Sequence, residues 1–215
     1  MHAFRDPKAF WNFRAETYDA QSGVTYAAAY NKTLERILHY VKPDDRVLDF
    51  ACGTGLVSLR LAPQVAQLTA IDISTSMIEK ANEKLSVSGD AAGKLTFLVL
   101  DLFSEKLPRK SFDVVLACNV LLYLKNREQV LSRIRELLKP GGLFLSATDC
   151  LGEGFSREGL RKWWKSHTGQ MPFVSFDSRT QLTDSIRAAG FSVLETETLF
   201  QTPPNVFVAA EKRNA

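Results

Sequence analysis

Short apolar runs alternate with helix-like segments along most of this 215-residue chain. Runs typical of buried strands lie at 46–50, 68–72, 95–101, 112–118, 142–149, 191–200 and 205–212. Strands that alternate with helices pair in parallel, with helices on both faces of the sheet. The last two runs are joined only by "QTPPN", which predicts an antiparallel pair. We therefore expect an α/β fold: an open, mostly parallel seven-stranded sheet with helices on both faces and an antiparallel C-terminal hairpin.

Capping residues stand where several helices are expected to begin. Ser and Asn side chains accept hydrogen bonds from free N–H groups at a helix start, and a Gln three residues on completes a capping box. The expected caps are Ser74, Asn126 with Gln129, and Ser178 with Gln181. Amphipathic segments near 7–19 and 24–41 precede the first strand.

The composition, 45% hydrophobic and 24% charged, is that of an ordinary globular domain. We expect one domain over 1–215, divided into an N-terminal helical cover (1–42), a cofactor-binding core (43–150), a lid insertion (151–177) and a C-terminal helix and hairpin (178–215). No apolar run is long enough to cross a bilayer, and no secretory signal is visible. The sequence thus predicts a cytoplasmic protein without a membrane partner.

Several classes of function are disfavoured. The three cysteines, odd in number and far apart, indicate no disulfide framework. The histidines, His2, His39 and His167, lack the close spacing of metal ligands, so no metal is expected. The net charge of +3 comes from Lys and Arg interleaved with Asp and Glu, which indicates no nucleic-acid surface.

The stretch "DFACGTG" lies between the first strand and a helix expected near Leu56. Ligands of such sheets bind beyond the carboxyl ends of the strands. Ala51, Gly53 and Gly55 let the backbone turn sharply and approach a ligand closely. A tight turn without a ligand is the alternative interpretation.

Three consecutive strands end in an acid: Asp49, Asp72 and Asp101. Asp72 follows Asp49 by 23 positions, where an acid accepts the hydroxyls of a ribose. A solvated strand end or a helix cap explains one such residue well but three poorly. The sequence therefore predicts a nucleoside site.

The loop does not suit a dinucleotide. The pattern is Ala51-x-Gly53-x-Gly55 and Val57 follows, so the place of a third glycine is not filled, and Asp49 would repel a pyrophosphate. A ligand without phosphate and with a net positive charge fits better. S-adenosylmethionine, with a sulfonium and an ammonium against one carboxylate, is such a ligand.

From about residue 10 to 212 the sequence resembles the class I S-adenosylmethionine-dependent methyltransferases. "VLDFACGTG" resembles their first motif, with Ala51 where glycine is commoner; "AIDIS" resembles the ribose-binding strand end, and "VLDL" the adenine-contacting one. "FDVVLACNVLLYL", "LLKPGGLFL" and "AAGFSVLE" resemble the later motifs. "FWNFRAETYD" is similar to an N-terminal segment of many small-molecule members. The resemblance implies a Rossmann-like methyltransferase fold and S-adenosylmethionine as cofactor.

The resemblance also implies roles for the matching residues. Those implied to face the methionine moiety or the sulfonium are Asp49, Ala51, Cys52, Gly53, Cys118 and Asn119. Those implied to bind the ribose and adenine are Asp72, Ile73, Met77, Asp101 and Leu102. Those that would cover the cofactor from the N-terminal segment are Trp11, Arg14 and Tyr18, although each suits helix packing equally well.

Only analogy with the family limits the possible methyl acceptors, and it favours a small organic molecule. Methyl transfer needs a base only if the acceptor loses a proton, and no residue stands out as one; His167, Asp149 and Tyr123 are the candidates. A non-catalytic cofactor-binding subunit, a protein or RNA methyltransferase, and a nucleotide-sugar or nicotinamide enzyme remain alternatives.

The segment 151–177 is too long for a plain connection and is expected to cover the acceptor. Gly152 and Gly154 would hinge it, and its basic character suits an anionic or aromatic acceptor. Arg161, Trp163 and Trp164 are the substrate-binding candidates, with one Trp packed inward and the other facing the pocket. The alternative is an amphipathic helix whose tryptophans pack on the body and whose cations face water.

Overall fold

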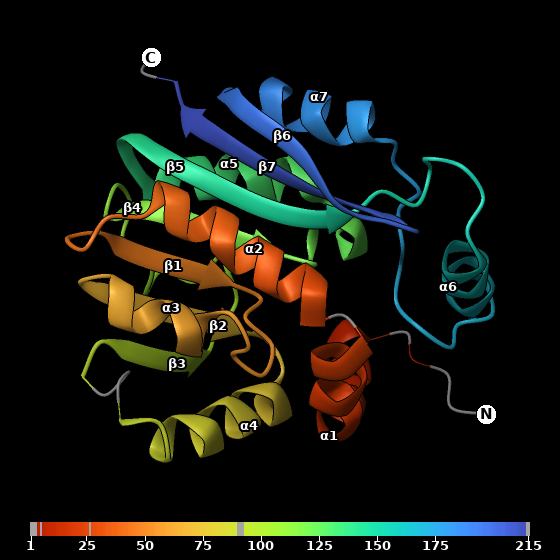
Figure 1. Ribbon diagram of the computed structural model, residues 1–215, viewed down its shortest axis with the longest axis horizontal. Helices are drawn as coiled ribbons and strands as arrows, with labels where there is room; N and C mark the ends of the chain where they lie inside the picture. Colours follow the sequence, from red (N-terminus) through yellow and green to blue (C-terminus); the bar gives the residue numbers. More distant parts are fainter. Residues whose placement is uncertain (1–3, 5, 26, 90–92, 214–215) are drawn as a thin grey trace.

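The computed structural model describes residues 4, 6–25, 27–89 and 93–213 (Figure 1). The strands are β1 (Arg46–Phe50), β2 (Gln67–Asp72), β3 (Leu95–Val99), β4 (Phe112–Cys118), β5 (Leu138–Asp149), β6 (Phe191–Gln201) and β7 (Pro204–Lys212). The helices are α1 (Pro7–Thr25), α2 (Ala27–Tyr40), α3 (Ser58–Leu61), α4 (Thr75–Ser86), α5 (Arg127–Leu137), α6 (Arg157–His167) and α7 (Arg179–Ala188), with 3₁₀ turns η1 (Ala62–Gln64) and η3 (Leu121–Tyr123).

The strands form one sheet in the order β3-β2-β1-β4-β5-β7-β6. β1 to β5 are parallel, and β7 runs antiparallel between β5 and β6. This arrangement confirms the expected fold, including the C-terminal hairpin. The strand order reverses at β1 and β4, so the crevice for a ligand lies beyond the carboxyl ends of these two strands.

Two apolar layers bury the two faces of the sheet. Val47 points into the layer formed with α2, α3 and α4, and Leu48 points into the layer formed with α5 and α7. Central strands are buried on both faces, which is why their sequences are continuously apolar. A third cluster, around Phe10, Leu122 and Met171, joins α1 to the segment 151–177. α1 and α6 therefore stand beyond the carboxyl ends of the strands (Figure 1).

Two of the three expected caps are confirmed. The Ser74 hydroxyl accepts a hydrogen bond from the Met77 N–H, and Ser178 and Gln181 form a capping box. The box expected at Asn126 and Gln129 is wrong: the Asn126 backbone is not extended, and its side chain accepts no capping hydrogen bond.

The helix expected near Leu56 is a single turn. α3 starts at Ser58 and gives way to η1 at Ala62. Pro63 has no N–H to donate, so the α-helical hydrogen bonds cannot continue through it.

Gly55 in the loop after β1 offers a stability test. Its φ is +78°, and a Cβ there would lie 2.6 Å from Cζ of the buried Phe97. Gly93 has φ +83° but open space around it. We expect Gly55→Ala to lower the free energy of unfolding by roughly 2–4 kcal/mol and Gly93→Ala by about 1–2 kcal/mol, because only the first adds a clash to the backbone strain. Denaturant unfolding measures both, and equal losses would contradict the account.

Candidate active site

The loop after β1 takes its shape from the backbone. Ala51, Gly53 and Gly55 have φ of 58°, 56° and 78°. The Cys52 N–H donates to the Ile71 carbonyl of β2, and the Gly55 N–H donates back to Cys52, both at 3.0 Å. A Cβ on Gly53 would meet only the Tyr18 ring, at 3.9 Å. The loop thus presents bare backbone to the space under α1.

Asp72 braces this loop. Its Oδ2 accepts the Gly53 N–H at 3.0 Å, and its Oδ1 accepts the Ser74 N–H at 2.8 Å. Burial raises the pKa of Asp72, and the backbone donors of Ser74 and Gly53 oppose that rise. Each carboxylate oxygen keeps a further lone pair for a ligand hydroxyl. The brace itself was not predicted from the sequence.

Asp49, at the end of β1, is a buried carboxyl without a cation. Its Oδ2 accepts the Ser58 hydroxyl, and no ion pair joins it to a basic side chain among the described residues. Burial raises its pKa to about 7; Ser58 lowers the pKa, and the charge of Asp72 raises it further. A buried carboxylate is costly unless it is paired. Asp49 therefore fits a ligand that brings a positive charge, as the ammonium group of S-adenosylmethionine does.

The residues expected at the adenosine lie on neighbouring elements. Asp101 is exposed after β3, and its Oδ1 accepts the Phe103 N–H at 2.7 Å. Leu102 and Met77 are buried, and Ile73 is half-buried. Their roles toward adenine stay predictions.

At the end of β4, Asn119 has φ 56° and donates its N–H to the Ala147 carbonyl at 2.7 Å. Its Oδ1 accepts the Asn205 amide at 2.9 Å. Burial raises the pKa of the Cys118 and Cys52 thiols, and Asp49 adds to the rise in both. Both cysteines are therefore neutral thiols at ordinary pH.

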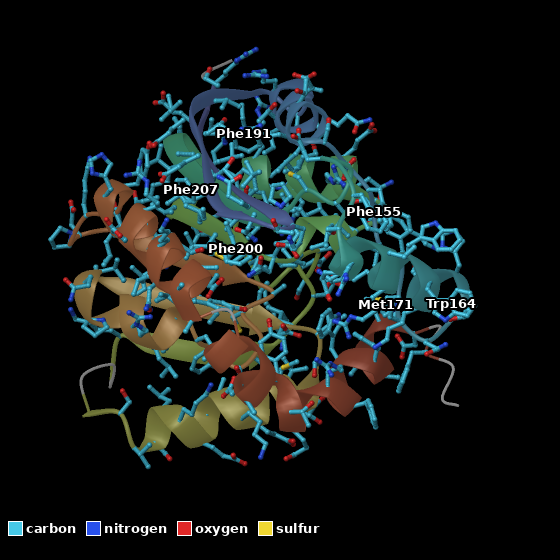
Figure 2. All side chains as sticks on the ribbon, turned by 45° about the vertical axis from the view of Figure 1, so that its right-hand side comes forward. Phe155, Trp164, Met171, Phe191, Phe200 and Phe207 are labelled. Atoms are coloured by element: carbon cyan, nitrogen blue, oxygen red, sulfur yellow. The ribbon has the colours of Figure 1, made fainter. Side chains whose placement is uncertain are left out.

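A cavity of about 450 Å³ lies beside this loop, between α1, α2, α6 and the ends of β5 and β7. Its apolar and aromatic lining includes Phe4, Phe10, Trp11, Phe13, Tyr18, Tyr30, Leu122, Tyr123, Met171 and Phe200. Figure 2 labels Met171 and Phe200, which reach it from opposite sides. Of the residues expected to cover the cofactor, Trp11, Arg14 and Tyr18 all line the cavity, as Asn119 does. The cavity and the cofactor residues thus share a wall.

Charged groups gather on one side of the cavity. Lys162 of α6 pairs with Asp149 at the end of β5 at 2.8 Å, and the Asn205 amide donates to Asp149 at 2.8 Å. Burial lowers the pKa of Lys162, but Tyr123 and Asp149 together raise it above its ordinary value. Lys162 is therefore a cation, and this ion pair fastens α6 to the sheet. The sequence analysis included Lys162 only in the basic character of segment 151–177 and did not predict this ion pair.

Three further cations lie along this wall. Arg14, Arg161 and Lys165 line the cavity. The pKa of Lys165 is lowered, first by burial and then by repulsion from Arg161 and Arg14. Glu158 is held by Arg161 within α6. With Lys162, the wall carries four cations against two carboxylates, Asp149 and Glu158.

The structure separates the three candidate bases. Asp149 and Tyr123 line the cavity, and burial raises the pKa of Tyr123. His167 lies outside the lining: its Nδ1 is 2.9 Å from the Trp163 carbonyl oxygen, and its ring stacks on Trp163.

The expectations for segment 151–177 need correction in two respects. Trp163 and Trp164 are both exposed and outside the cavity lining, whereas Arg161 lines it. Neither tryptophan packs inward, because Lys162 takes the inward face to reach Asp149. Gly152 is a point of close approach: its N–H donates to Asp177, and a Cβ would lie 2.4 Å from the Phe176 carbonyl oxygen. It ties the ends of the segment together, which does not suit a hinge.

Among the described residues, no group of three or more His, Cys, Asp and Glu side chains is placed to hold a metal ion. His2 lies outside them. The same part of the chain contains no helix long and apolar enough to span a bilayer.

Comparisons with known proteins agree with this geometry. A family model described as a methyltransferase domain matches residues 48–144. The fusarielin synthase of Gibberella zeae is 33% identical over 184 residues, which cover 78% of this chain and 7% of that synthase. The chain spans 4–7% of the length of such curated relatives.

Solved structures share the fold. A Haemonchus contortus phosphoethanolamine N-methyltransferase, in complex with phosphomonomethylethanolamine and S-adenosylhomocysteine, superposes with a TM-score of 0.75 at 20% identity, over 97% of this chain and 61% of that one. The [4+2]-cyclase SpnF superposes with a TM-score of 0.71 at 19% identity, over 86% and 81%.

The sheet order, the braced loop and the buried Asp49 carboxyl are the features expected of an α/β protein that binds a cationic nucleoside. The chain belongs to the class I S-adenosylmethionine-dependent methyltransferases. Its cofactor is S-adenosylmethionine, and the residues at the strand ends fit that molecule.

Asp49 predicts a pH dependence of stability. Its pKa is about 7 in the folded protein against 3.8 ordinarily, so the folded state holds an extra proton between these values. Stability without ligand therefore falls as pH rises through this window. We expect Asp49→Asn to be more stable than wild type at pH 8, by an amount that shrinks toward pH 5, and to bind S-adenosylhomocysteine more weakly.

Denaturant unfolding at both pH values measures this difference. Asp113→Asn is the control, because its partners Lys139 and Arg46 lower the Asp113 pKa below its ordinary 3.8 against the effect of burial, so Asp113 is ionised at both pH values and the substitution should lower stability equally at pH 5 and pH 8. A difference between wild type and Asp49→Asn that does not change with pH would contradict the assignment.

Asp72 predicts a cofactor-affinity effect. Loss of two charge-assisted hydrogen bonds in Asp72→Ala should cost roughly 2–4 kcal/mol of S-adenosylhomocysteine affinity by calorimetry. Because Asp72 also braces the loop, a 2′-deoxyribose analogue separates the two effects. We expect the analogue to bind wild type more weakly than the parent compound but to bind Asp72→Ala equally well. If removal of the 2′-hydroxyl weakened binding equally in wild type and Asp72→Ala, Asp72 would only brace the loop and would not bind the ribose.

Proposed function

We propose that this chain transfers a methyl group from S-adenosylmethionine to a small organic acceptor that bears an acidic group and binds in the cavity under α6. The observation that carries the proposal is the shared wall: Tyr18 and Asn119 line the cavity, and Tyr18 is also the nearest neighbour of the bare Gly53 backbone. A volume of about 450 Å³ suits a small molecule better than a protein or RNA. A cytoplasmic location, as expected from the sequence, is part of this proposal.

The chain's residues would mainly bind and align. S-adenosylmethionine supplies an electrophilic methyl group when bound. Asp49 would neutralise its ammonium group, and Asp72 would fix its ribose, so that the methyl group points toward the cavity. Trp11 and Tyr123, in edge contact at 5.2 Å between ring centroids, would exclude water from the reacting atoms. Holding two reactants in line can contribute roughly 7–11 kcal/mol to catalysis in favourable cases.

The acidic group of the acceptor is inferred from the charged wall. Arg161 and Lys165 come from α6, and the mutual repulsion that lowers the Lys165 pKa would be relieved by an anion between them. The aromatic residues opposite would pack on an apolar body. Several relatives are named polyketide synthases, but the chain spans only a small part of those proteins.

The test is a set of carboxylic, phosphorylated and neutral acceptors incubated with S-adenosylmethionine, with release of S-adenosylhomocysteine as the readout. We expect turnover with anionic members of the set. A protein that binds S-adenosylhomocysteine but shows no turnover with any acceptor class would instead be a non-catalytic subunit. The cyclase neighbour SpnF shows that this fold is not confined to proteins named as methyltransferases, so substrate consumption without methylation would also overturn the proposal.

Arg161 and Lys165 give a prediction of their own. We expect Arg161→Gln and Lys165→Gln each to raise the KM of an anionic acceptor about tenfold, or ~1.4 kcal/mol, with S-adenosylhomocysteine affinity unchanged. Arg187→Gln is the matched control, because Arg187 is half-exposed on α7 and pairs with Asp184 far from the cavity. If all three variants raised the KM equally, or if none of them changed it, the anion site would be rejected.

A further inference from the structure

α6 is amphipathic, but its charged face, and not its apolar face, is directed toward the body of the protein. Leu160, Trp163, Trp164 and His167 recur at the spacing of one helix face. The first three are 53%, 43% and 59% exposed. The opposite face carries Glu158, Lys162 and Lys165, which line the cavity, and the side chain of Lys162 is only 13% exposed. The charged face thus points inward and the apolar face outward.

The aromatic surface extends beyond the helix. Phe155, just before α6, is 83% exposed. Figure 2 shows Phe155 and Trp164 at the edge of the molecule formed by α6, away from the body. Isolated exposed apolar residues are common, but a run of them on one short helix marks an interaction surface.

The charges beside this surface have one sign. Arg157 borders the apolar face and is exposed, and Ser156 caps the helix without charge. Arg161 lies at the edge between this face and the cavity, where it pairs with Glu158. The acid of α6, Glu158, lines the cavity on the other face. The outer face of α6 therefore combines Leu, Phe and Trp side chains with Arg157, with Arg161 at its edge, and carries no carboxylate.

We propose that this outer face of α6 binds an anionic membrane surface, with the helix lying in the plane of the interface. Arginines beside Trp, Phe and Leu are the composition of interfacial helices. Indole rings suit this position because they are apolar with one polar N–H. The eleven-residue helix is about 16 Å long, too small for the ~800 Å² that each partner contributes to a standard protein interface.

This inference departs from the sequence expectation of no membrane partner. That expectation rested on the absence of a spanning segment, and a helix in the interface leaves no such run. The inference does not depend on the identity of the acceptor, although a membrane bound at α6 would lie beside the cavity lined by its inner face.

The test is sedimentation of the full chain with vesicles of phosphatidylcholine alone or mixed with phosphatidylglycerol. We expect binding to the mixed vesicles, loss of that binding in high salt, and a blue shift of tryptophan emission with protection from acrylamide. The double substitution Leu160→Glu and Trp164→Glu should raise the lipid concentration for half-binding at least tenfold. Leu194→Glu is the control, because Leu194 is 52% exposed on β6 and lies outside α6.

Absence of binding to the mixed vesicles by wild type would overturn the proposal, as would an equal loss in Leu194→Glu. A concentration-dependent dimer that the double substitution abolishes, without vesicle binding, would assign the face to a second copy instead. Thermal unfolding and S-adenosylhomocysteine titration check that the variants are folded. Failure of wild type to bind S-adenosylhomocysteine would count against the proposed function alone, because the vesicle assay does not require the cofactor.

Discussion

The hydrogen bonds of the Asp72 carboxylate hold the site together. One oxygen binds the N–H of Gly53 in the loop after β1, and the other binds the N–H of Ser74 at the start of α4. A single side chain at the end of β2 therefore sets the distance between two backbone segments at the predicted cofactor site. The parallel pairing of β1 with β2 makes this possible, because it brings Phe50 level with Ile71 and so places both strand ends at one edge.

The neighbouring Asp49 shows the cost of burying a carboxyl group. Burial raises its pKa to about 7, because the protein interior disfavours a negative charge there. A solvated carboxylate would cost the fold nothing but would attract an ammonium group weakly, since water screens it. If Asp49 binds the ammonium group as predicted, its burial lowers the stability of the free protein and strengthens the attraction to the ligand.

The fold could be predicted from the sequence because the patterns that indicate strands, turns and loops are local. The central strands are buried on both faces, and continuous runs such as "FDVVLAC" reveal this without any knowledge of partners. The glycine loop and the acids at three strand ends were likewise readable, because parallel strands place their carboxyl ends together. Asn126 shows the limit of such reading: the residue type suits a cap, but its backbone conformation does not.

Segment 151–177 shows what local signals cannot supply. The usual rule puts the apolar face of a helix against the body, and that rule pointed the tryptophans of α6 inward or toward the pocket. Asp149 reverses the outcome, because a carboxylate at the end of β5 attracts Lys162 from the helix. The spacing of residues in α6 does not predict that Lys162 pairs with Asp149, which lies 13 residues earlier in β5.

One ion pair therefore accounts for both faces of α6. Once Lys162 is turned inward, the helix geometry carries Glu158 and Lys165 to the cavity and leaves Leu160 and Trp164 on the outside. The charged lining of the cavity and the exposed apolar face of α6 are then two consequences of the same orientation of the helix about its axis. The residues of the two faces occupy different positions of the same eleven-residue helix. The two properties are thus separable by substitution, although a single contact to the sheet sets both.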